Sequence, residues 1–437
     1  MRRILVICGL GLALGLSVPA TAGTLFVIDG RGWGHGVGMS QYGAQGYAQS
    51  GWRYPRILAH YYRGTKLRLL PGSDVRVLLL ERRASVRIGS SKPFRIVDAR
   101  GKKRTLKAGT RRFTAGRRKG LRFPLRVEAG ASPLRLEGSA YRGMLRLHRV
   151  GDRLTVVNQL PLNRYLRGVV PWEMPYYWHP EALKAQSVVA RSYALATLKP
   201  STLFDLYADT RSQVYGGIAA EKISTNRAIA ATGGRVLLWR GRVATTFYHS
   251  TSGGRTAPID QVWPKAAPVP YLISVPDPYD RISKHHRWGP LVLRPEELAQ
   301  RVKAPGVRDL IVERTTSGRA AAVDLKTRHG VVRTILAQDF RRELGLRSTW
   351  FAVRVLNLDP PVRRALIDRT TKLSGFVRGL RRVRLEQQVN GGAWTVVRRV
   401  RPRRDGRFTV SIRPKRTTSY RLATGQVAGA TITVVAR

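Results

Sequence analysis

One long helical segment lies between two stretches of short strand patterns, and this arrangement most constrains the fold. Residues 181–198 have an alanine-rich interior, with Pro180 in the first turn and Glu181 near the positive end of the helix dipole. The many small residues indicate that another element packs closely against this helix. Strands on both sides of such a helix are typical of a mixed architecture, so the chain is predicted to have the α+β fold class.

The region before this helix, residues 66–165, has the pattern of short strands separated by turns. Basic clusters at 102–104 and 117–119 fall between strand patterns and are interpreted as solvated hairpin tips. The region is therefore predicted to be the β-rich part of a domain that extends to residue 355. The expected strands are 75–80, 85–88, 94–98, 134–136, 145–148 and 154–157.

Shorter patterns complete the same domain. Helices are expected at 54–62, at 225–232, from about Pro295, and at 337–344, and a strand is expected at 242–248. The clearest of these patterns, 54–62, places Ile57, Leu58 and Tyr61 on one helical face.

The last segment, residues 361–437, is predicted to be a separate Ig-like β-sandwich. It carries 19 Lys+Arg against 3 Asp+Glu, a net charge of +16, and turn signals at 390–392 and 405–406. It has no histidine and no plausible carboxylate pair, which favours a binding or spacing module over a catalytic one. The expected strands are 373–377, 383–389, 394–400, 407–412, 417–422 and 430–435.

The first 22 residues are predicted to be an export signal. Arg2 and Arg3 precede an apolar run over residues 4–18, and Ala20-Thr21-Ala22 fits a cleavage site. The apolar run is shorter than the ~20 residues that span a bilayer. The single cysteine, Cys8, lies in this signal, so the mature chain has no disulfide and no cysteine-based metal or redox centre.

The net charge of +53 predicts attraction to polyanions. Outside the cell the available polyanions are cell-wall polymers and lipid head groups. The zinc-finger and RNP-type signatures of nucleic-acid modules are also absent, so nucleic acid is not the expected partner. Anionic cell-wall polymer is expected instead, with the protein secreted or attached to the wall.

Glu173 is the strongest candidate for catalysis. It lies between Trp172 and Met174 and precedes the aromatic segment 176–178. A carboxyl in apolar surroundings has a raised pKa, as a general acid requires, and aromatic walls suit sugar rings. The alternative is that Glu173 caps the following helix, but Glu181 lies directly at the helix start and fits that role better.

Several blocks around Glu173 carry a family resemblance. They are Glu173-Met174-Pro175 with 180–186 and 190–194, the segment 212–217, the segment 247–256 with 262–263 and 271–272, and the Gly-rich block 32–44. Over roughly residues 30–355 the sequence resembles the SpoIID/LytB family of peptidoglycan-acting proteins. In sporulation members of that family the Gly-rich block comes near the C-terminus, whereas here it precedes the β-rich region.

The resemblance implies a lytic transglycosylase that cleaves MurNAc–GlcNAc strands, preferably free of stem peptides, to 1,6-anhydroMurNAc ends. It also implies that the family's catalytic glutamate is Glu173. One carboxyl group is enough for this chemistry, because the MurNAc C6 hydroxyl replaces water as the nucleophile. No cofactor is required.

The resemblance further implies that residues 23–65 join the cleft through the Gly-rich block. Trp33 and Tyr42 are expected to stack on sugar rings, and His35 and Gln41 to hydrogen-bond hydroxyls. A purely structural Gly-rich turn is the alternative. Gln186 and Tyr193 share one helix face, toward the cleft or toward buried loop carbonyls. The other matched blocks contribute the substrate-binding candidates Gln213, Tyr215, His249, Ser250 and Ser252.

Some members of that family bind zinc through His and Cys. The mature chain has no cysteine, so no metal site is expected, although His249, His285 and His286 remain. The main alternative to an enzyme is a non-catalytic wall-binding protein or an amidase enhancer, with a peptidoglycan amidase as partner. The Trp-Glu-Met-Pro setting of Glu173 favours the enzyme.

Overall fold

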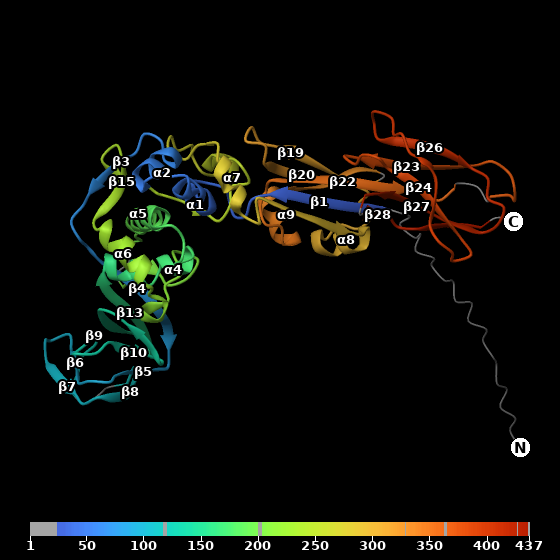
Figure 1. The fold of residues 1–437 in the computed structure, drawn as a ribbon. Coiled ribbons are helices and arrows are strands. Elements are labelled where there is room, and N and C mark those ends of the chain that lie inside the picture. The colour runs from blue at the N-terminus through green and yellow to red at the C-terminus, as the bar shows by residue number, and fades with distance from the viewer. Residues whose placement is uncertain are drawn as a thin grey trace, which may run out of the picture.

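The computed structural model describes residues 24–116, 120–199, 203–327, 329–361, 365–425 and 427–435. The predicted export signal lies outside these ranges. Figure 1 shows two limbs that meet near α1 (Gln41–Gln49) and α7 (Ile259–Val262). One limb holds strands and helices, and the other is an extended arm that carries the C-terminus. Within the described ranges, no helix is long and apolar enough to cross a membrane.

Two sheets form the far end of the first limb. Their strands are β4 (Asp74–Arg83), β5 (Ser85–Ser90), β6 (Phe94–Val97), β7 (Lys103–Leu106), β8 (Gly109–Thr114), β9 (Leu125–Glu128), β10 (Leu134–Leu136), β11 (Ser139–Tyr141), β12 (Met144–Val150), β13 (Arg153–Pro161) and β14 (Leu206–Tyr207). The larger sheet has the order β14-β4-β13-β12-β9-β6-β7, and the smaller has the order β11-β10-β5-β8. Ile88 and Phe113 of the smaller sheet share one core with Val127 and Leu147 of the larger.

Helices gather at the centre of this limb (Figure 1). Besides α1, they are α2 (Tyr54–Tyr61), α3 (Leu162–Arg167), α4 (Val170–Glu173), α5 (Pro180–Ala196) and α6 (Ile223–Ala231). The long helix α5 contacts α1, α2, α3 and α6. Its Ala182, Ala185 and Ala190 are fully buried, so the close packing predicted from its small residues is confirmed.

The arm is built on a five-stranded sheet. The N-terminal strand β1 (Leu25–Arg31) lies between β18 (Arg287–Leu293) and β22 (Phe351–Leu358), and β23 (Thr371–Arg378) and β26 (Arg407–Ile412) continue the sheet. One core joins this sheet to the elements β19 (Asp309–Arg314), β20 (Ala320–Thr327), β21 (Gly330–Leu336), α8 (Pro295–Val302) and α9 (Ala337–Leu344).

A further sheet forms the tip of the arm. It contains β24 (Arg384–Val389), β25 (Thr395–Arg399), β27 (Thr418–Thr424), β28 (Val427–Ala428) and β29 (Ile432–Val434). Leu385 and Leu422 from this sheet share a core with Leu25, Val27 and Leu356 from the five-stranded sheet. The hydrogen-bonded pairing of β22 with β23 crosses the predicted boundary at residue 361, so the sheet is continuous there. The separate Ig-like sandwich stays a prediction.

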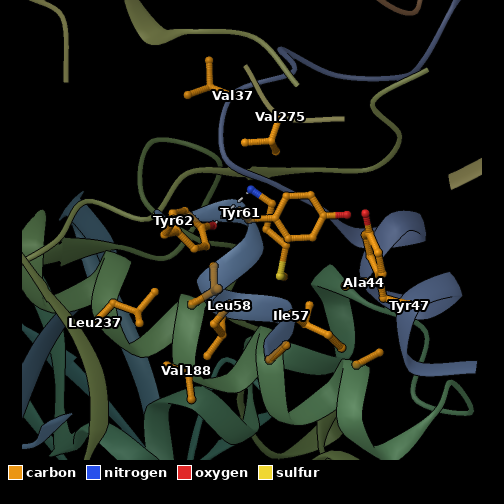
Figure 2. Close-up of a cluster of buried hydrophobic side chains, with 14 of the residues drawn as sticks. Val37, Ala44, Tyr47, Ile57, Leu58, Tyr61, Tyr62, Val188, Leu237 and Val275 are labelled. Carbon is orange, nitrogen blue, oxygen red and sulfur yellow. Dashed lines mark hydrogen bonds between the residues drawn. The ribbon is translucent and has the colours of Figure 1, made fainter. Parts of the chain in front are cut away.

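The Gly-rich block crosses from the arm to the helices. After β1, its short strand β2 (Met39–Ser40) pairs in parallel with β17 (Tyr248–His249), and α1 follows directly. Figure 2 shows the core next to it, where Val37 lies above Tyr61 and Tyr62 of the α2 region and Ala44 lies beside Tyr47. The Tyr62 hydroxyl accepts from the Met39 amide at 3.1 Å. The block therefore has a fixed place beside β17.

The predicted mixture of helices and strands is confirmed, and most predicted elements lie within a few residues of their observed positions. The predicted strand 242–248 is wrong as one element, because the chain forms β16 (Arg242–Val243) and then runs irregularly to β17. Lys103 and Arg104, predicted at a hairpin tip, belong to β7. The cluster at 117–119 lies outside the described residues.

Candidate active site

Glu173 ends the short helix α4, and its side chain is partly buried. Burial raises the pKa of its carboxyl, while hydrogen bonds from the Tyr248 hydroxyl and the Val214 amide lower it. The net shift is upward, as the sequence predicted. The burial does not come from the aromatic residues nearby in sequence, because Trp172 and Tyr177 are 63% and 74% exposed. The surroundings of Glu173 come from other segments instead.

A chain of polar side chains leads to Glu173. The Tyr165 hydroxyl donates to Gln213 Oε1 at 3.5 Å, and Gln213 Nε2 donates to the Tyr248 hydroxyl at 3.2 Å. The Tyr248 hydroxyl in turn donates to the Glu173 carboxylate. Each residue of this chain donates to the next one, so the chain orients the Tyr248 hydroxyl that donates to Glu173.

The hydroxyls around Glu173 resist ionisation. Burial and the Glu173 charge together raise the pKa of Tyr165, Tyr193 and Tyr248. They therefore act as neutral hydrogen-bond donors across the neutral pH range. Tyr165 and Tyr248 were missed by the sequence analysis, although Tyr248 lies inside a matched block.

Two side chains of the Gly-rich block hydrogen-bond to backbone atoms of this cluster. His35 Nδ1 accepts from the Val37 amide at 3.0 Å, and the other ring nitrogen donates to the Tyr248 backbone. Burial lowers the His35 pKa to about 4, so the ring is neutral at pH 7 and this tautomer is fixed. Gln41 Nε2 donates to the Glu173 carbonyl at 2.7 Å. His35 and Gln41 thus hydrogen-bond the backbone of Tyr248 and of Glu173, and their contact with a sugar stays a prediction.

The two aromatic candidates of the block lie in different places. Tyr42 packs edge-on against Trp178, with ring centroids 4.7 Å apart, in the loop that follows Glu173. Trp33 is 43% exposed, and its ring lies edge-on to His285 at 4.4 Å and beneath the Arg347 guanidinium at 5.2 Å. Tyr42 therefore belongs to the Glu173 side, whereas Trp33 belongs to the junction with the arm.

Of the helix candidates, Tyr193 joins the Glu173 cluster and Gln186 lies in the interior. The Tyr193 ring is 6.2 Å from that of Tyr248. Gln186 is fully buried, and among the described residues neither of its amide atoms has a hydrogen-bond partner.

The remaining candidates form hydrogen bonds to residues other than Glu173. Tyr215 is buried, and its hydroxyl donates to Asn158 at 2.9 Å. His249 is buried beside Val37, and burial holds its pKa well below the usual value. The Ser250 carbonyl accepts from the Tyr42 amide, and the Ser252 hydroxyl donates to Asp280 at 2.9 Å.

A pair of buried aspartates, Asp277 and Asp280, accepts hydrogen bonds from the loop after β17 and from α2. Asp280 accepts from Ser252 and the Gly253 amide, and the Tyr61 hydroxyl donates to Asp277 at 2.8 Å. Burial and the Asp280 charge raise the pKa of Asp277 to about 7. The sequence analysis missed this pair, since Ser252, Gly253 and Tyr61 are all at least 27 residues away along the chain.

Asp277→Asn is expected to stabilise the protein at neutral and alkaline pH. The folded-state pKa exceeds the unfolded value, so the wild-type protein loses stability as the pH rises from about 4 to about 7. The neutral amide removes this loss, by an amount on the order of a few kcal/mol. Thermal unfolding at pH 4 and pH 8 measures it, with exposed Asp152→Asn as the control. A gain that is equal at both pH values would contradict the buried acid.

Among the described residues, no group of three or more His, Cys, Asp or Glu side chains is placed to hold a metal ion. His286 Nδ1 lies 2.7 Å from Asp280 Oδ1, and His285 packs against Trp33. The histidines therefore take part in the packing between the block and its neighbouring loops.

Part of the chain that carries Glu173 is similar in sequence to a family of sporulation proteins. A family model described as SpoIID, stage II sporulation protein, matches residues 150–239, the segment that carries Glu173, α5 and Gln213. This segment of the chain is therefore similar to the SpoIID family.

Named relatives also match part of the chain. An amidase enhancer of Bacillus subtilis (strain 168) is 44% identical over 115 residues, 26% of this chain and 15% of that protein. Stage II sporulation protein D of Bacillus amyloliquefaciens is 28% identical over 216 residues, 45% of this chain and 60% of that protein. The aligned part of this chain thus spans less than two thirds of either relative. No solved structure matches the chain significantly.

Proposed function

We propose that the protein is an exported lytic transglycosylase that cleaves peptidoglycan glycan strands with Glu173 as general acid and base. The observation that carries the proposal is a partly buried carboxyl with a raised pKa, held by Tyr248 and the Val214 amide. Among the described residues, no second carboxylate contributes to that shift. The SpoIID-family match and the relatives' names support a role at the cell wall.

The proposed reaction uses the carboxyl group twice. The protonated Glu173 donates its proton to the glycosidic oxygen as the bond to the anomeric carbon breaks. The MurNAc C6 hydroxyl then bonds to that carbon and gives its proton to the Glu173 carboxylate, which restores the acid. Water is not consumed, and the product ends in 1,6-anhydroMurNAc.

Mass spectrometry of peptide-free glycan strands after incubation with the full chain tests this proposal. Anhydro ends, 18 Da lighter than the matching reducing ends by the loss of one water, support it. Reducing ends would indicate a hydrolase, for which a second carboxylate is needed. Intact strands would favour the other candidate, a wall-binding amidase enhancer. That alternative rests on the 44% identical relative of that name, and its readout is faster cleavage by an added amidase.

Tyr248→Phe is expected to shift the pH dependence of cleavage. The Tyr248 hydrogen bond stabilises the Glu173 carboxylate, so its removal raises the Glu173 pKa further. The acid form then persists to higher pH, and the alkaline limb of the kcat profile moves upward. Exposed Tyr177→Phe is the matched control. A limb that moves downward, or moves equally in the control, would contradict the contact.

A further inference from the structure

A cavity of about 540 Å³ lies on the arm, where three strands end together. Its walls come from the end of β1, the starts of β18 and β22, and Arg314 at the end of β19. Two tryptophans, Trp288 and Trp350, and four arginines line it. Figure 1 places β1 and β22 in the arm, whereas α4 with Glu173 lies in the other limb. The cavity is therefore separate from the candidate active site.

The charges in the cavity are unbalanced. The one acidic lining residue, Asp29, is paired with Arg354. Arg314 donates to the carbonyls of Gly318 and Phe351, and the Arg31 guanidinium lies 5.5 Å from the Trp350 ring centre. Among the described residues, no carboxylate pairs with Arg31, Arg287 or Arg314. Arg31 and Arg287 thus remain for an anion, whereas two guanidinium nitrogens of Arg314 are bound to backbone carbonyls.

The local backbone is shaped to hold a tryptophan against the strand. The register between β1 and β18 shifts between Ile28 and Gly30. A Cβ at Gly30 would lie 2.4 Å from the Trp288 ring and from the Trp350 carbonyl. Glycine at this position therefore permits Trp288 to lie against β1. The Trp288 indole nitrogen is buried, and it has no hydrogen-bond partner among the described residues.

We infer that this cavity binds one sugar residue that carries a carboxylate, as the MurNAc unit of a peptide-free strand does. Tryptophan faces suit the apolar faces of a sugar ring, and an arginine fork matches a carboxylate with two parallel hydrogen bonds. The lactyl carboxylate of MurNAc is free only when the stem peptide is absent, because the peptide converts it to an amide.

The inference rests on the proposed function for its ligand and adds a second subsite to it. A glycan strand held at the arm raises the concentration of its neighbouring units around the same molecule. Arg31 directly precedes the Gly-rich block that supports Glu173, so the cavity adjoins the junction of the two limbs. Selection of peptide-free strands would then depend on the arm as well as on the catalytic cleft.

Calorimetric titration of the full chain carrying Glu173→Gln tests the inference without turnover. The ligands are GlcNAc–MurNAc oligosaccharides with free lactyl carboxylates and the same oligosaccharides with lactyl amides. Arg31→Gln and Arg287→Gln, each alone, are expected to weaken binding of the carboxylate form about tenfold. Arg342→Gln, an exposed arginine on α9 outside the cavity, is the charge-matched control.

Preference for the carboxylate form that disappears in both cavity variants, but not in the control, supports the inference. Equal binding of the acid and amide forms would overturn it, and this comparison needs no arginine variant. Equal loss in all three arginine variants would also overturn it, since only total charge would then matter. Tighter binding of a glycerol phosphate oligomer than of the carboxylate oligosaccharide would also overturn the inference, because the cavity would then bind a phosphodiester polymer. Product analysis of the wild-type chain tests the proposed function separately.

Discussion

Glu173→Gln is expected to abolish the formation of 1,6-anhydroMurNAc ends while glycan binding is retained. The amide is nearly isosteric with the carboxyl, but it can neither donate a proton to the glycosidic oxygen nor accept one from the C6 hydroxyl. General acid–base catalysis contributes about 10²–10⁴-fold, so turnover should fall by at least that range. Initial rates on peptide-free glycan, read by mass spectrometry, give the factor. Exposed Glu313→Gln serves as the control.

The same variant has a stability signature. The folded-state pKa of Glu173 is raised, so the wild-type protein loses stability as the pH rises from the unfolded pKa to the folded one. Glu173→Gln is therefore expected to raise the melting temperature more at pH 7 than at pH 4. A variant that keeps full turnover would exclude Glu173 as the acid. A lowered melting temperature at pH 7 would instead mean that the two hydrogen bonds outweigh burial.

Local patterns predicted the elements that depend on nearby residues. Helix α5 has its proline, acidic residue and small side chains within one segment, and the structure places it at Pro180–Ala196. Its N-cap differs from the prediction, because His179 accepts from the Glu181 amide while Glu181 binds the Tyr54 amide and Lys184. Glu173 was chosen as the candidate acid from aromatic and apolar neighbours in sequence; its raised pKa is confirmed, although Trp172 and Tyr177 are exposed.

Contacts between distant segments could not be predicted in the same way. Gln41 is 132 residues from Glu173, and the Tyr165–Gln213–Tyr248 chain joins three separate segments. Block matching named Gln213 but gave no direction for its side chain. His35 has a residue type that suits sugar hydroxyls, yet both ring nitrogens are used by the backbone of β17 and the block itself. Contacts between segments far apart in the sequence therefore determine how these side chains are placed.

The boundary at residue 361 shows the same limit. Turn signals and strand spacing describe each strand but not its partner, so β23 was assigned to a separate module. In the structure β23 extends the sheet that starts at β1, with Leu356 opposite Val377 and Leu358 opposite Gly375. The basic charge of the segment still favours a role in binding anionic wall polymer, but that role would belong to the whole arm.

Removing residues 361–437 is therefore expected to unfold the arm. The deletion would expose Leu25, Val27, Leu356 and Leu358, which are now 5% exposed or less. Losing the burial of each costs about 1.5–3 kcal/mol, and the deletion also leaves β22 as an unpaired edge. Limited proteolysis should then cut within residues 287–358, and thermal unfolding should lose one transition. Cores around α5 and around β12 contain none of these residues, so the first limb should stay resistant.

A matched pair of substitutions checks the same core in the intact chain. Leu356 is fully buried between the two sheets of the arm, and Leu366 is 60% exposed. Leu356→Ala should destabilise the arm by about 2–5 kcal/mol, whereas Leu366→Ala should change its stability by no more than about 0.5 kcal/mol. Equal effects, or a truncated chain whose residues 287–358 stay protected, would mean that the C-terminal strands form an independent domain. In that case residues 361–437, and any wall binding by them, could be removed without unfolding the arm, because the core of the arm would stay packed without β23.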